Sequence, residues 1–415
     1  MHSFFRVSHR MRNLFEDQIS EGEIFANKEV LRPTYTPDTL PHREKHITGL
    51  AQILSTALRG KTTPNVLIYG DRGTGKTSTV KYVCREFEEM ARKTGSNCAL
   101  LYINSEMLDT QYRVFAYIAR VFNKRVPMIG WPTDLVYSVL KREIDAEERH
   151  VIVTLDELDL LASKEGETLP NLLRINGELN NAHLSVIGIS NDLAFKDLLD
   201  PRVKSSLSEE ELLFSPYSAE QLEDILYARA EMAFTDAALD DMVIPRCAAL
   251  AASKQGDAKY ALDLLRVSGE NAERSRSKRV REEHVQLASE TIQADNVAEE
   301  IKSLPLHSKI VLSSVLLLSR DREKRGFSSG EVYSMYQRLC HYLGTSALTP
   351  RRVTDFVSEL DILGLLNAVI VNKGRYGRTK IISLGIPEEC VQPVLFGDYK
   401  LRALANVSEI APIPV

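Results

Sequence analysis

Residues Gly70 to Thr77 read Gly-Asp-Arg-Gly-Thr-Gly-Lys-Thr, which fits the phosphate-binding pattern G-x-x-x-x-G-K-[ST]. The apolar run Asn65–Tyr69 before them predicts a strand, and helical spacing of apolar residues from Thr77 to Glu89 predicts a helix after them. At such a turn, backbone N–H groups and the helix N-terminus converge on an anion. Lys76 then contacts the β and γ phosphates of a nucleotide, and the Thr77 hydroxyl binds Mg²⁺. The candidate ATP-binding residues here are Gly70, Arg72, Gly73, Thr74, Gly75, Lys76 and Thr77, the alternative being a glycine-rich turn with a lone lysine.

Two adjacent carboxylates follow a later apolar run. Val151–Leu155 predicts a buried strand, and Asp156 and Glu157 come directly after it. This is the expected second half of a P-loop ATPase, in which Asp156 holds the Mg²⁺ shell beside the nucleotide and Glu157 polarises the attacking water as a general base. The alternative is that the pair only caps the next helix.

Two further polar residues follow strand-like or loop segments that could lie near the γ phosphate. Asn191 comes after the run 185–190 and could position a water molecule, or it is a turn residue. Arg202 follows a proline and could act as an arginine finger on a neighbouring subunit's nucleotide, whereas a surface salt bridge explains it equally well.

The elements that must position these residues follow a regular order. Four strand-like runs alternate with helical patterns and predict a parallel sheet covered by helices: 66–69, 99–103, 151–155 and 184–189. Residues 218–295 predict a separate helical domain. The last part has the order of a winged helix, with helices at 308–318, 328–343 and 349–363 and strands at 365–371 and 379–384. We therefore expect domains at 1–208, 209–298 and 299–415.

Bulk composition narrows the class of protein. The chain has 415 residues, 44% of them hydrophobic, which is enough for several domains. The five cysteines show no pairing or metal-ligand spacing, and no sustained apolar segment resembles a signal or a membrane span. We expect a cytoplasmic, nucleoid-associated protein without a membrane partner. Residues 301–415 carry 15 basic against 10 acidic residues, which leaves a net charge of −10 for residues 1–300. This modest asymmetry fits either a polyanion partner for the C-terminal part or ordinary solvated surface.

Taken together, these motifs resemble those of the archaeal AAA+ replication initiators, the family that combines features of the origin recognition complex and of the cell-division-cycle helicase loader. The resemblance rests on segments spread over nearly the whole chain: 39–44, 69–77, 112–115, 155–159, 188–192, 202–207 and 256–262. It implies an α/β P-loop AAA+ domain with a parallel sheet, an α-helical lid and a C-terminal winged helix. It also implies ATP or ADP with Mg²⁺ as cofactors, with Thr77 and Asp156 as the metal-binding residues.

The resemblance adds roles that spacing alone does not supply. Asn191 corresponds to the first sensor and Arg202 to the arginine finger. Tyr217 and Arg229 match positions that contact nucleotide. The residues expected near the adenine are Pro41, His42 and Arg43, although His42 and Arg43 also fit a helix N-terminal turn without a ligand.

One position departs from the family pattern. Where the family usually has arginine at the start of the second-sensor helix, this chain has Lys259. Lysine keeps the charge but loses the bidentate fork, so nucleotide binding can persist while hydrolysis or lid coupling weakens. The sequence leaves open whether the protein hydrolyses ATP efficiently, and it favours slow turnover with ATP acting as a switch.

Candidate DNA contacts lie in two places. In similar initiators the segment 106–131 touches DNA, and here it offers Tyr112, Arg113, Arg120, Lys124 and Arg125, unless it forms an amphipathic helix packed on the core. In the winged helix, the start of the third helix and the hairpin offer Thr349, Arg351, Arg352, Lys373, Arg375, Arg378 and Lys380. A winged helix that binds protein is the alternative.

These expectations combine into one function. The chain is predicted to be an ATP-binding replication initiator that recognises double-stranded origin DNA and helps recruit or load the replicative helicase, with paralogous initiator subunits as further partners. Two alternatives remain: a clamp-loader-like motor with non-specific DNA contact, and a regulatory ATPase whose winged helix binds protein.

Overall fold

The computed structural model describes residues 24–33, 35–108, 110–164, 167–320, 326–372 and 378–406. The chain divides into two compact units, one ending at Ala288 and one beginning at Ser289. Among the residues described, no helix combines the length and the apolar character that a membrane span requires. The division into three domains expected from the sequence stays a prediction at its finer boundaries.

The first unit is built on a five-stranded parallel sheet with the order β2-β3-β4-β1-β5. Its strands are β1 (Val66–Gly70), β2 (Cys98–Asn104), β3 (His150–Asp156), β4 (His183–Ser190) and β5 (Glu210–Phe214). The first four confirm the expected runs. The fifth, β5, pairs with β1 and lies beyond residue 208, where we expected the core to end. As an edge strand that begins with exposed Glu210 and Glu211, it lacks the continuous apolar run of a central strand.

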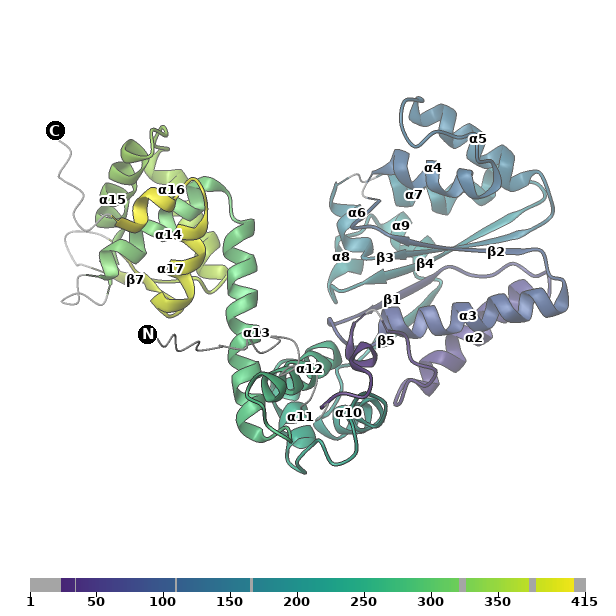
Figure 1. Ribbon diagram of the computed structural model, residues 1–415. Coiled ribbons are helices and arrows are strands. Elements are labelled where there is room, and N and C mark those ends of the chain that lie inside the picture. The colour runs from purple at the N-terminus through teal and green to yellow at the C-terminus, as the bar shows by residue number, and fades with distance from the viewer. Residues whose placement is uncertain are drawn as a thin grey trace, which may run out of the picture. The chain divides into compact units, whose positions relative to one another are not determined.

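Helices cover both faces of this sheet (Figure 1). Val66 and Ile68 of β1 face the core formed with α2 (Glu44–Leu58) and α3 (Lys76–Thr94). Leu67, between them, points to the opposite core, as the two-residue period of a strand requires. That second core includes residues of α4 (Gln111–Phe122), α5 (Thr133–Asp145), α6 (Leu158–Lys164), α7 (Thr168–Arg174) and α9 (Pro201–Leu207). The short elements η2 (Ile175–Glu178) and α8 (Phe195–Leu198) complete this side.

A helical lid follows the sheet within the same unit. Its helices are α10 (Ala219–Ala233), α11 (Val243–Ser253) and α12 (Ala258–Arg274), joined by the N-terminal turn η1 (Lys28–Leu31), which packs on α10 and α12. A capping box fixes the start of α10, because Ser218 and Gln221 satisfy each other's backbone N–H groups. The long helix α13 (Glu282–Ser303) then leads out of the lid.

The second unit has the element order of a winged helix. It contains α14 (Leu306–Ser319), α15 (Ser329–Tyr342), α16 (Pro350–Ile362) and the antiparallel hairpin β7 (Leu366–Asn372) and β8 (Arg378–Leu384). These confirm the expected elements. The structure adds β6 (Phe327–Ser328), α17 (Glu388–Gly397) and η4 (Arg402–Asn406), which were not predicted. Buried Tyr336 ties the unit together, since its hydroxyl pairs with His307 Nδ1 at 2.8 Å and accepts from Leu348 N at 3.1 Å.

Candidate nucleotide-binding site

The loop between β1 and α3 has a backbone that only glycine tolerates at two positions. Gly73 has φ +70°, and a Cβ there would lie 1.6 Å from Asp257 Oδ1 of the lid. Gly75 has φ +85°, and a Cβ there would lie 2.7 Å from the Tyr217 hydroxyl. The N–H of Ala258, at the start of α12, donates to the Gly73 carbonyl at 3.1 Å. The lid therefore rests directly on this loop, and the close approach explains the glycines as much as their dihedral angles do.

Lys76 lies inside the loop. Its side chain is only 4% exposed, and Nζ donates to the carbonyls of Gly70 at 2.8 Å and Asp71 at 2.7 Å. Burial lowers the pKa of Lys76 to about 8, partly offset by nearby carboxylates such as Asp156. A phosphate group at the loop would favour the charged ammonium, because an opposite charge close by raises the pKa of an amine.

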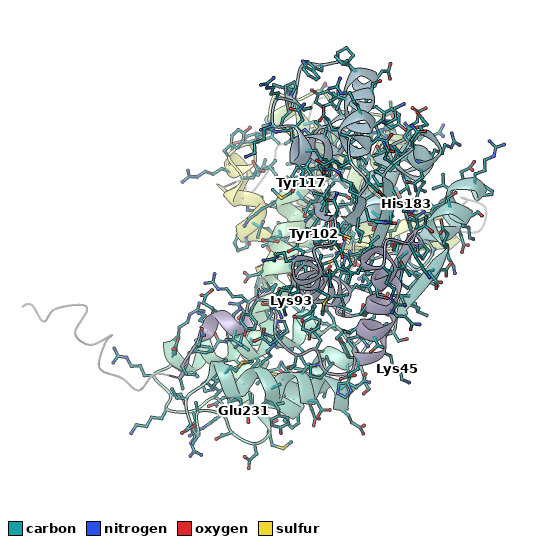
Figure 2. The ribbon with its side chains drawn as sticks, turned by 90° about the vertical axis from the view of Figure 1, so that its right-hand side faces the viewer. Lys45, Lys93, Tyr102, Tyr117, His183 and Glu231 are labelled. Carbon is teal, nitrogen blue, oxygen red and sulfur yellow. The ribbon has the colours of Figure 1, made fainter. Side chains whose placement is uncertain are left out.

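A hydroxyl and a carboxylate meet beside Lys76. Thr77 Oγ1 donates to Asp156 Oδ2 at 3.0 Å, and the Tyr102 hydroxyl donates to the same oxygen. Burial is the main cause that raises the pKa of Tyr102, followed by its bond to Asp156. Two adjacent oxygen donors of this type fit Mg²⁺, which prefers carboxylate and hydroxyl oxygens. Sequence analysis missed Tyr102 (Figure 2), whose only signal is its position on β2 opposite Thr154 of β3.

Glu157 leaves the end of β3 in an uncommon backbone conformation. Its φ is +55°, and its N–H donates to Asp156 Oδ1 at 3.0 Å. Burial raises the pKa of Glu157, and the negative charges of Glu106 and Asp156 raise it further. Asn191, at the end of β4, donates its N–H to Asp159 Oδ1 at 3.3 Å. The carboxyl ends of two neighbouring strands thus carry a carboxylate and an amide, as a site that positions water requires.

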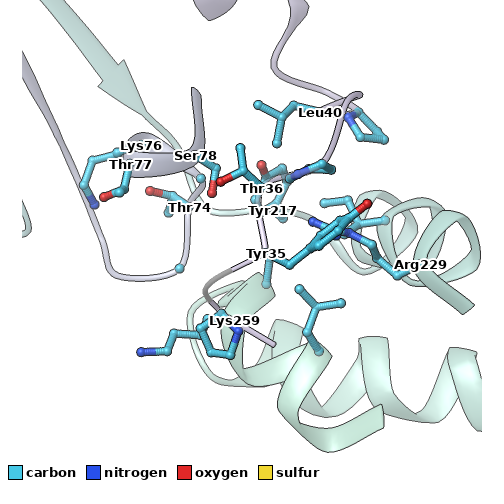
Figure 3. Close-up of a pocket in the computed structure, with 18 of the residues that line it drawn as sticks. Tyr35, Thr36, Leu40, Thr74, Lys76, Thr77, Ser78, Tyr217, Arg229 and Lys259 are labelled. Atoms are coloured by element: carbon cyan, nitrogen blue, oxygen red, sulfur yellow. The ribbon is translucent and has the colours of Figure 1, made fainter. Parts of the chain in front are cut away.

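A cavity of about 270 Å³ opens above the loop. Figure 3 shows Lys76 and Thr77 at one end and Tyr35 and Arg229 toward the other. The wall is completed by residues of the segments 32–33 and 35–41, by Asn191 and by residues of α10 and α12. Among these are the apolar side chains Pro33, Leu40, Ile225, Met232 and Leu262. One end therefore suits phosphate groups and the other suits an aromatic base.

Arg43 supports the phosphate-binding loop through hydrogen bonds. Its guanidinium donates to the carbonyls of Thr74 at 2.9 Å and Ser215 at 2.8 Å, and lies 3.8 Å from the ring centroid of Tyr217. Burial lowers the pKa of Arg43. The phosphate-binding loop therefore has a buried, hydrogen-bonded support.

The three residues expected near the adenine occupy different places. Pro41 lies in the cavity wall, whereas His42 and Arg43 are not among the side chains that line it. His42 instead pairs with Asp224 Oδ2 of α10 at 2.8 Å, and has φ +64°. Their part in nucleotide binding stays a prediction, and the geometry favours an indirect one.

The remaining predicted ATP residues come from the lid and the core. Tyr217 and Arg229 both line the cavity, and Arg229 also donates to the Val30 carbonyl at 3.2 Å and lies 4.8 Å from the Tyr35 ring. Lys259 is exposed at the start of α12 and lines the cavity. Arg72 is exposed beside the loop, and Arg202 is exposed on α9. An arginine finger that acts on a neighbouring subunit must be exposed, as Arg202 is, and its role as a finger stays a prediction.

The candidate DNA-contacting side chains of the first unit lie on and after α4. This helix buries Val114, Phe115 and Ile118 in the core, so it is packed on the sheet as well as exposed on its outer face. The Tyr112 hydroxyl donates to Pro127 O at 3.2 Å and accepts from Trp131 N at 3.3 Å, which gives it a structural role. The exposed basic residues here are Arg113, Arg120, Lys124 and Arg125.

The candidates of the winged helix are only partly described. Thr349, Arg351 and Arg352 are exposed at the start of α16. Lys380 is turned onto α16, where Nζ donates to Ser358 Oγ at 2.7 Å. Lys373 and Arg375 lie outside the described residues, and of Arg378 only the backbone is described. Among the described residues of the winged helix, the exposed candidates therefore lie at the start of α16, and their contact with DNA stays a prediction.

Comparison with known proteins fixes the family. Three families match in order: "AAA ATPase domain" over residues 39–187, "Cdc6 AAA+ ATPase-type lid domain" over 223–290 and "CDC6, C terminal winged helix domain" over 299–393. The chain is 54% identical over 394 residues to the ORC1-type DNA replication protein 1 of Methanosarcina acetivorans, covering 95% of each. It belongs to the family of ORC1-type DNA replication proteins. The predicted family and fold class are thereby confirmed.

Further relatives agree. The ORC1-type DNA replication protein 1 of Archaeoglobus fulgidus is 51% identical over 392 residues, which is 94% of this chain and 95% of that one. Among solved structures, the Aeropyrum pernix ORC1 protein in complex with DNA is 44% identical, with a TM-score of 0.83 over 92% of this chain and all of that one. The AAA+ ATPase assignment supports nucleotide binding by this chain.

Proposed function

We propose that this ORC1-type protein is a replication initiator that binds duplex origin DNA under the control of a bound adenine nucleotide. The observation that carries the proposal is the cavity walled jointly by the phosphate-binding loop and the lid, on a chain that also bears a winged helix. Because the lid forms part of the wall, a ligand in the cavity contacts both parts and can favour one lid position over another. Sequence identity to a relative solved with DNA supports the nucleic-acid partner.

The nucleotide contacts follow from the placement of the side chains. The loop N–H groups and Lys76 bind the phosphates, and Tyr217, Arg229 and Lys259 contact the nucleotide from the lid side. Thr77 and Asp156 would hold Mg²⁺, which would supply positive charge to neutralise the phosphates. Tyr102 keeps the Asp156 carboxylate in place by occupying one lone pair of Oδ2.

Hydrolysis is proposed to be slow and to end the active state. Glu157 accepts a proton from the attacking water, Asn191 orients that water, and Arg202 reaches the nucleotide of a neighbouring subunit. Glu157→Gln should keep nucleotide binding and abolish turnover, because it removes the base without changing the shape of the side chain. Equilibrium binding of a fluorescent ATP analogue and a single-turnover hydrolysis assay separate the two effects.

The DNA contacts are proposed at the start of α16 and along α4. Thr349, Arg351 and Arg352 point their exposed side chains from a helix N-terminus, which suits entry into a major groove. The basic residues after Tyr112 would contact the phosphate backbone. The replicative helicase and paralogous initiator subunits are the proposed protein partners of the DNA-bound state on the chromosome.

The deciding experiment is a salt titration of binding to origin-region and scrambled duplexes by fluorescence anisotropy, with ATP and with ADP. A preference of about 4–10 kcal/mol for particular fragments, modulated by the nucleotide, is expected for a sequence-specific initiator. Equal and steeply salt-dependent binding to all duplexes would favour the clamp-loader-like motor. Absence of binding would favour a winged helix that binds protein.

A further inference from the structure

The connection between α12 and α13 is the most basic short segment of the first unit. Residues 274–281 read Arg-Ser-Arg-Ser-Lys-Arg-Val-Arg, with five basic and no acidic side chains, although residues 1–300 carry a net charge of −10. The nucleotide cavity, α4 and the winged helix do not involve this basic loop. A local excess of positive charge on an acidic body calls for a specific explanation.

The basic loop has a defined backbone held by hydrogen bonds. Ser277 N donates to Ala272 O at 2.9 Å, and Arg276 has φ +54° where the chain leaves α12. Val280 is buried and pairs with the segment before α11, its N–H donating to Ala238 O at 2.7 Å. The basic side chains are therefore presented from a fixed frame, so that binding an anion costs little backbone ordering.

The ion pairs of three of these cations are weak. Arg279 and Arg281 share one carboxylate, Asp240, each at 3.8 Å, with side chains 56% and 62% exposed. Arg274 is 71% exposed and lies 3.9 Å from Glu270. That carboxylate is already paired with Lys28 at 2.6 Å and Arg266 at 2.7 Å. Long, exposed pairs of this kind contribute little to stability, and a phosphate can replace them.

Acidic residues on both sides limit the length of the positively charged segment. Glu273 comes before the basic loop and Glu282 and Glu283 follow it, so its positive field is confined to residues 274–281. Four of its five cations are arginines, whose planar forks match phosphate oxygens in a bidentate manner. Exposed side chains spaced along a short turn fit a row of phosphates rather than a single buried anion.

We propose that the basic loop contacts the phosphate backbone of bound duplex DNA, as a contact separate from α4 and from the winged helix. This inference rests on the proposed function, since it assumes a DNA-binding protein. The loop follows the C-terminus of α12, a helix of 17 residues that is about 25 Å long and whose first residues rest on Gly73. The proposed phosphate contact therefore follows directly on α12, the helix whose first residues contact the phosphate-binding loop.

The test uses the full chain with Arg274→Gln, Lys278→Gln and Arg279→Gln combined. Arg276 and Arg281 are kept because the backbone of the loop turns at Arg276 and the Arg281 N–H donates to His284 Nδ1 at 2.9 Å. The matched control, Arg59→Gln, Arg92→Gln and Lys93→Gln, removes the same charge from exposed positions at the ends of α2 and α3. Thermal unfolding and ATP-analogue binding verify that both variants are folded.

In the basic-loop variant, the slope of log K against log salt should become less steep by up to about 2.7, or about 0.9 for each phosphate that the variant no longer neutralises. The loss of affinity should be equal for origin and scrambled duplexes, since phosphate contacts carry no sequence information. The control variant should keep most of the wild-type slope. An unchanged slope in the basic-loop variant, or an equal loss in the control, would overturn the inference. Failure of the wild-type protein to bind any duplex would instead overturn the proposed function.

Discussion

The nucleotide cavity and the start of α16, the proposed DNA-binding helix, differ in how their residues are held. Around the phosphate-binding loop, Lys76 and Arg43 are both 4% exposed, and each donates two or more hydrogen bonds to backbone carbonyls. At the start of α16, Arg351 and Arg352 are exposed, and Arg352 lies 4.0 Å from Asp355 and 5.3 Å from the centroid of the Phe356 ring. The first site is therefore coupled to the stability of its fold, whereas the second can change at little cost to the fold.

This difference separates two kinds of functional residue. A buried, bonded group acts through geometry, so that its loss disturbs both the site and the structure around it. An exposed cation acts through its charge, so that its loss changes affinity and salt dependence alone. Substitutions in the two regions should consequently differ in what they change as well as in how much.

The largest effect is expected from Gly73→Ala. The new Cβ would lie 1.6 Å from Asp257 Oδ1 and 3.0 Å from its Cα, so the start of α12 must move away from the loop. Overpacking of this kind costs about 1–3 kcal/mol, in addition to about 1–2 kcal/mol for a non-glycine residue at positive φ. We expect nucleotide affinity, measured by equilibrium titration, to fall by roughly two orders of magnitude or more.

Gly60→Ala is the matched control for this substitution. Gly60 has φ +67°, close to that of Gly73, but no atom lies within 4 Å of a Cβ placed there. It should lower the free energy of unfolding by about 1–2 kcal/mol and leave nucleotide affinity unchanged. Similar affinities in the two variants would show that contact between loop and lid is unimportant for the cavity.

The second largest effect, on the free energy of unfolding, is expected from Arg43→Ala. Removing the guanidinium leaves the carbonyls of Thr74 and Ser215 without their buried donor, and should lower the free energy of unfolding by about 2–4 kcal/mol. Arg43→Lys should rescue little, because one ammonium lacks the fork that bridges both carbonyls. Urea unfolding gives the stability, and Arg85→Ala, an exposed arginine of α3, should change it by less than about 0.5 kcal/mol. Full rescue by lysine would mean that charge alone matters at this position.

The features that could be predicted from the sequence are those set by local patterns, whereas contacts between distant segments could not be predicted. The loop, β1 to β4, α12 and the winged-helix elements were predictable because glycine spacing and apolar runs record local geometry. Tyr102 and the support given by Arg43 depend on contacts between distant segments, which no local pattern records. The strand β5 was missed because an edge strand needs only one apolar face. The cavity-lining residues of segments 32–33 and 35–41 were missed, except for Pro41, because they belong to an irregular chain.

A smaller effect of a different kind is expected from Arg351→Gln combined with Arg352→Gln. Since both side chains are exposed, the free energy of unfolding should change by less than about 0.5 kcal/mol. The salt slope of DNA binding should become less steep by about 0.9 for each phosphate left without its cation. Loss of preference for origin over scrambled duplex would show that one of them reads a base. Arg402→Gln, an exposed arginine of η4, serves as the control, and an equal change there would argue against DNA binding by α16.

The smallest effect is expected at Lys259, which belongs to both classes because it is exposed and yet lines the nucleotide cavity. Lys259→Arg supplies the bidentate fork that lysine lacks, and should raise ATP turnover about fivefold, or about 1 kcal/mol, with little change in stability. Lys254→Arg makes the same exchange at the end of α11, where the lysine lies 4.3 Å from the Tyr260 ring, and should leave turnover unchanged. A gain confined to Lys259 would mean that this position limits hydrolysis through the shape of its cation. No gain would place the limit at Glu157, Asn191 or Arg202, and would favour a protein in which ATP binding alone sets the lid.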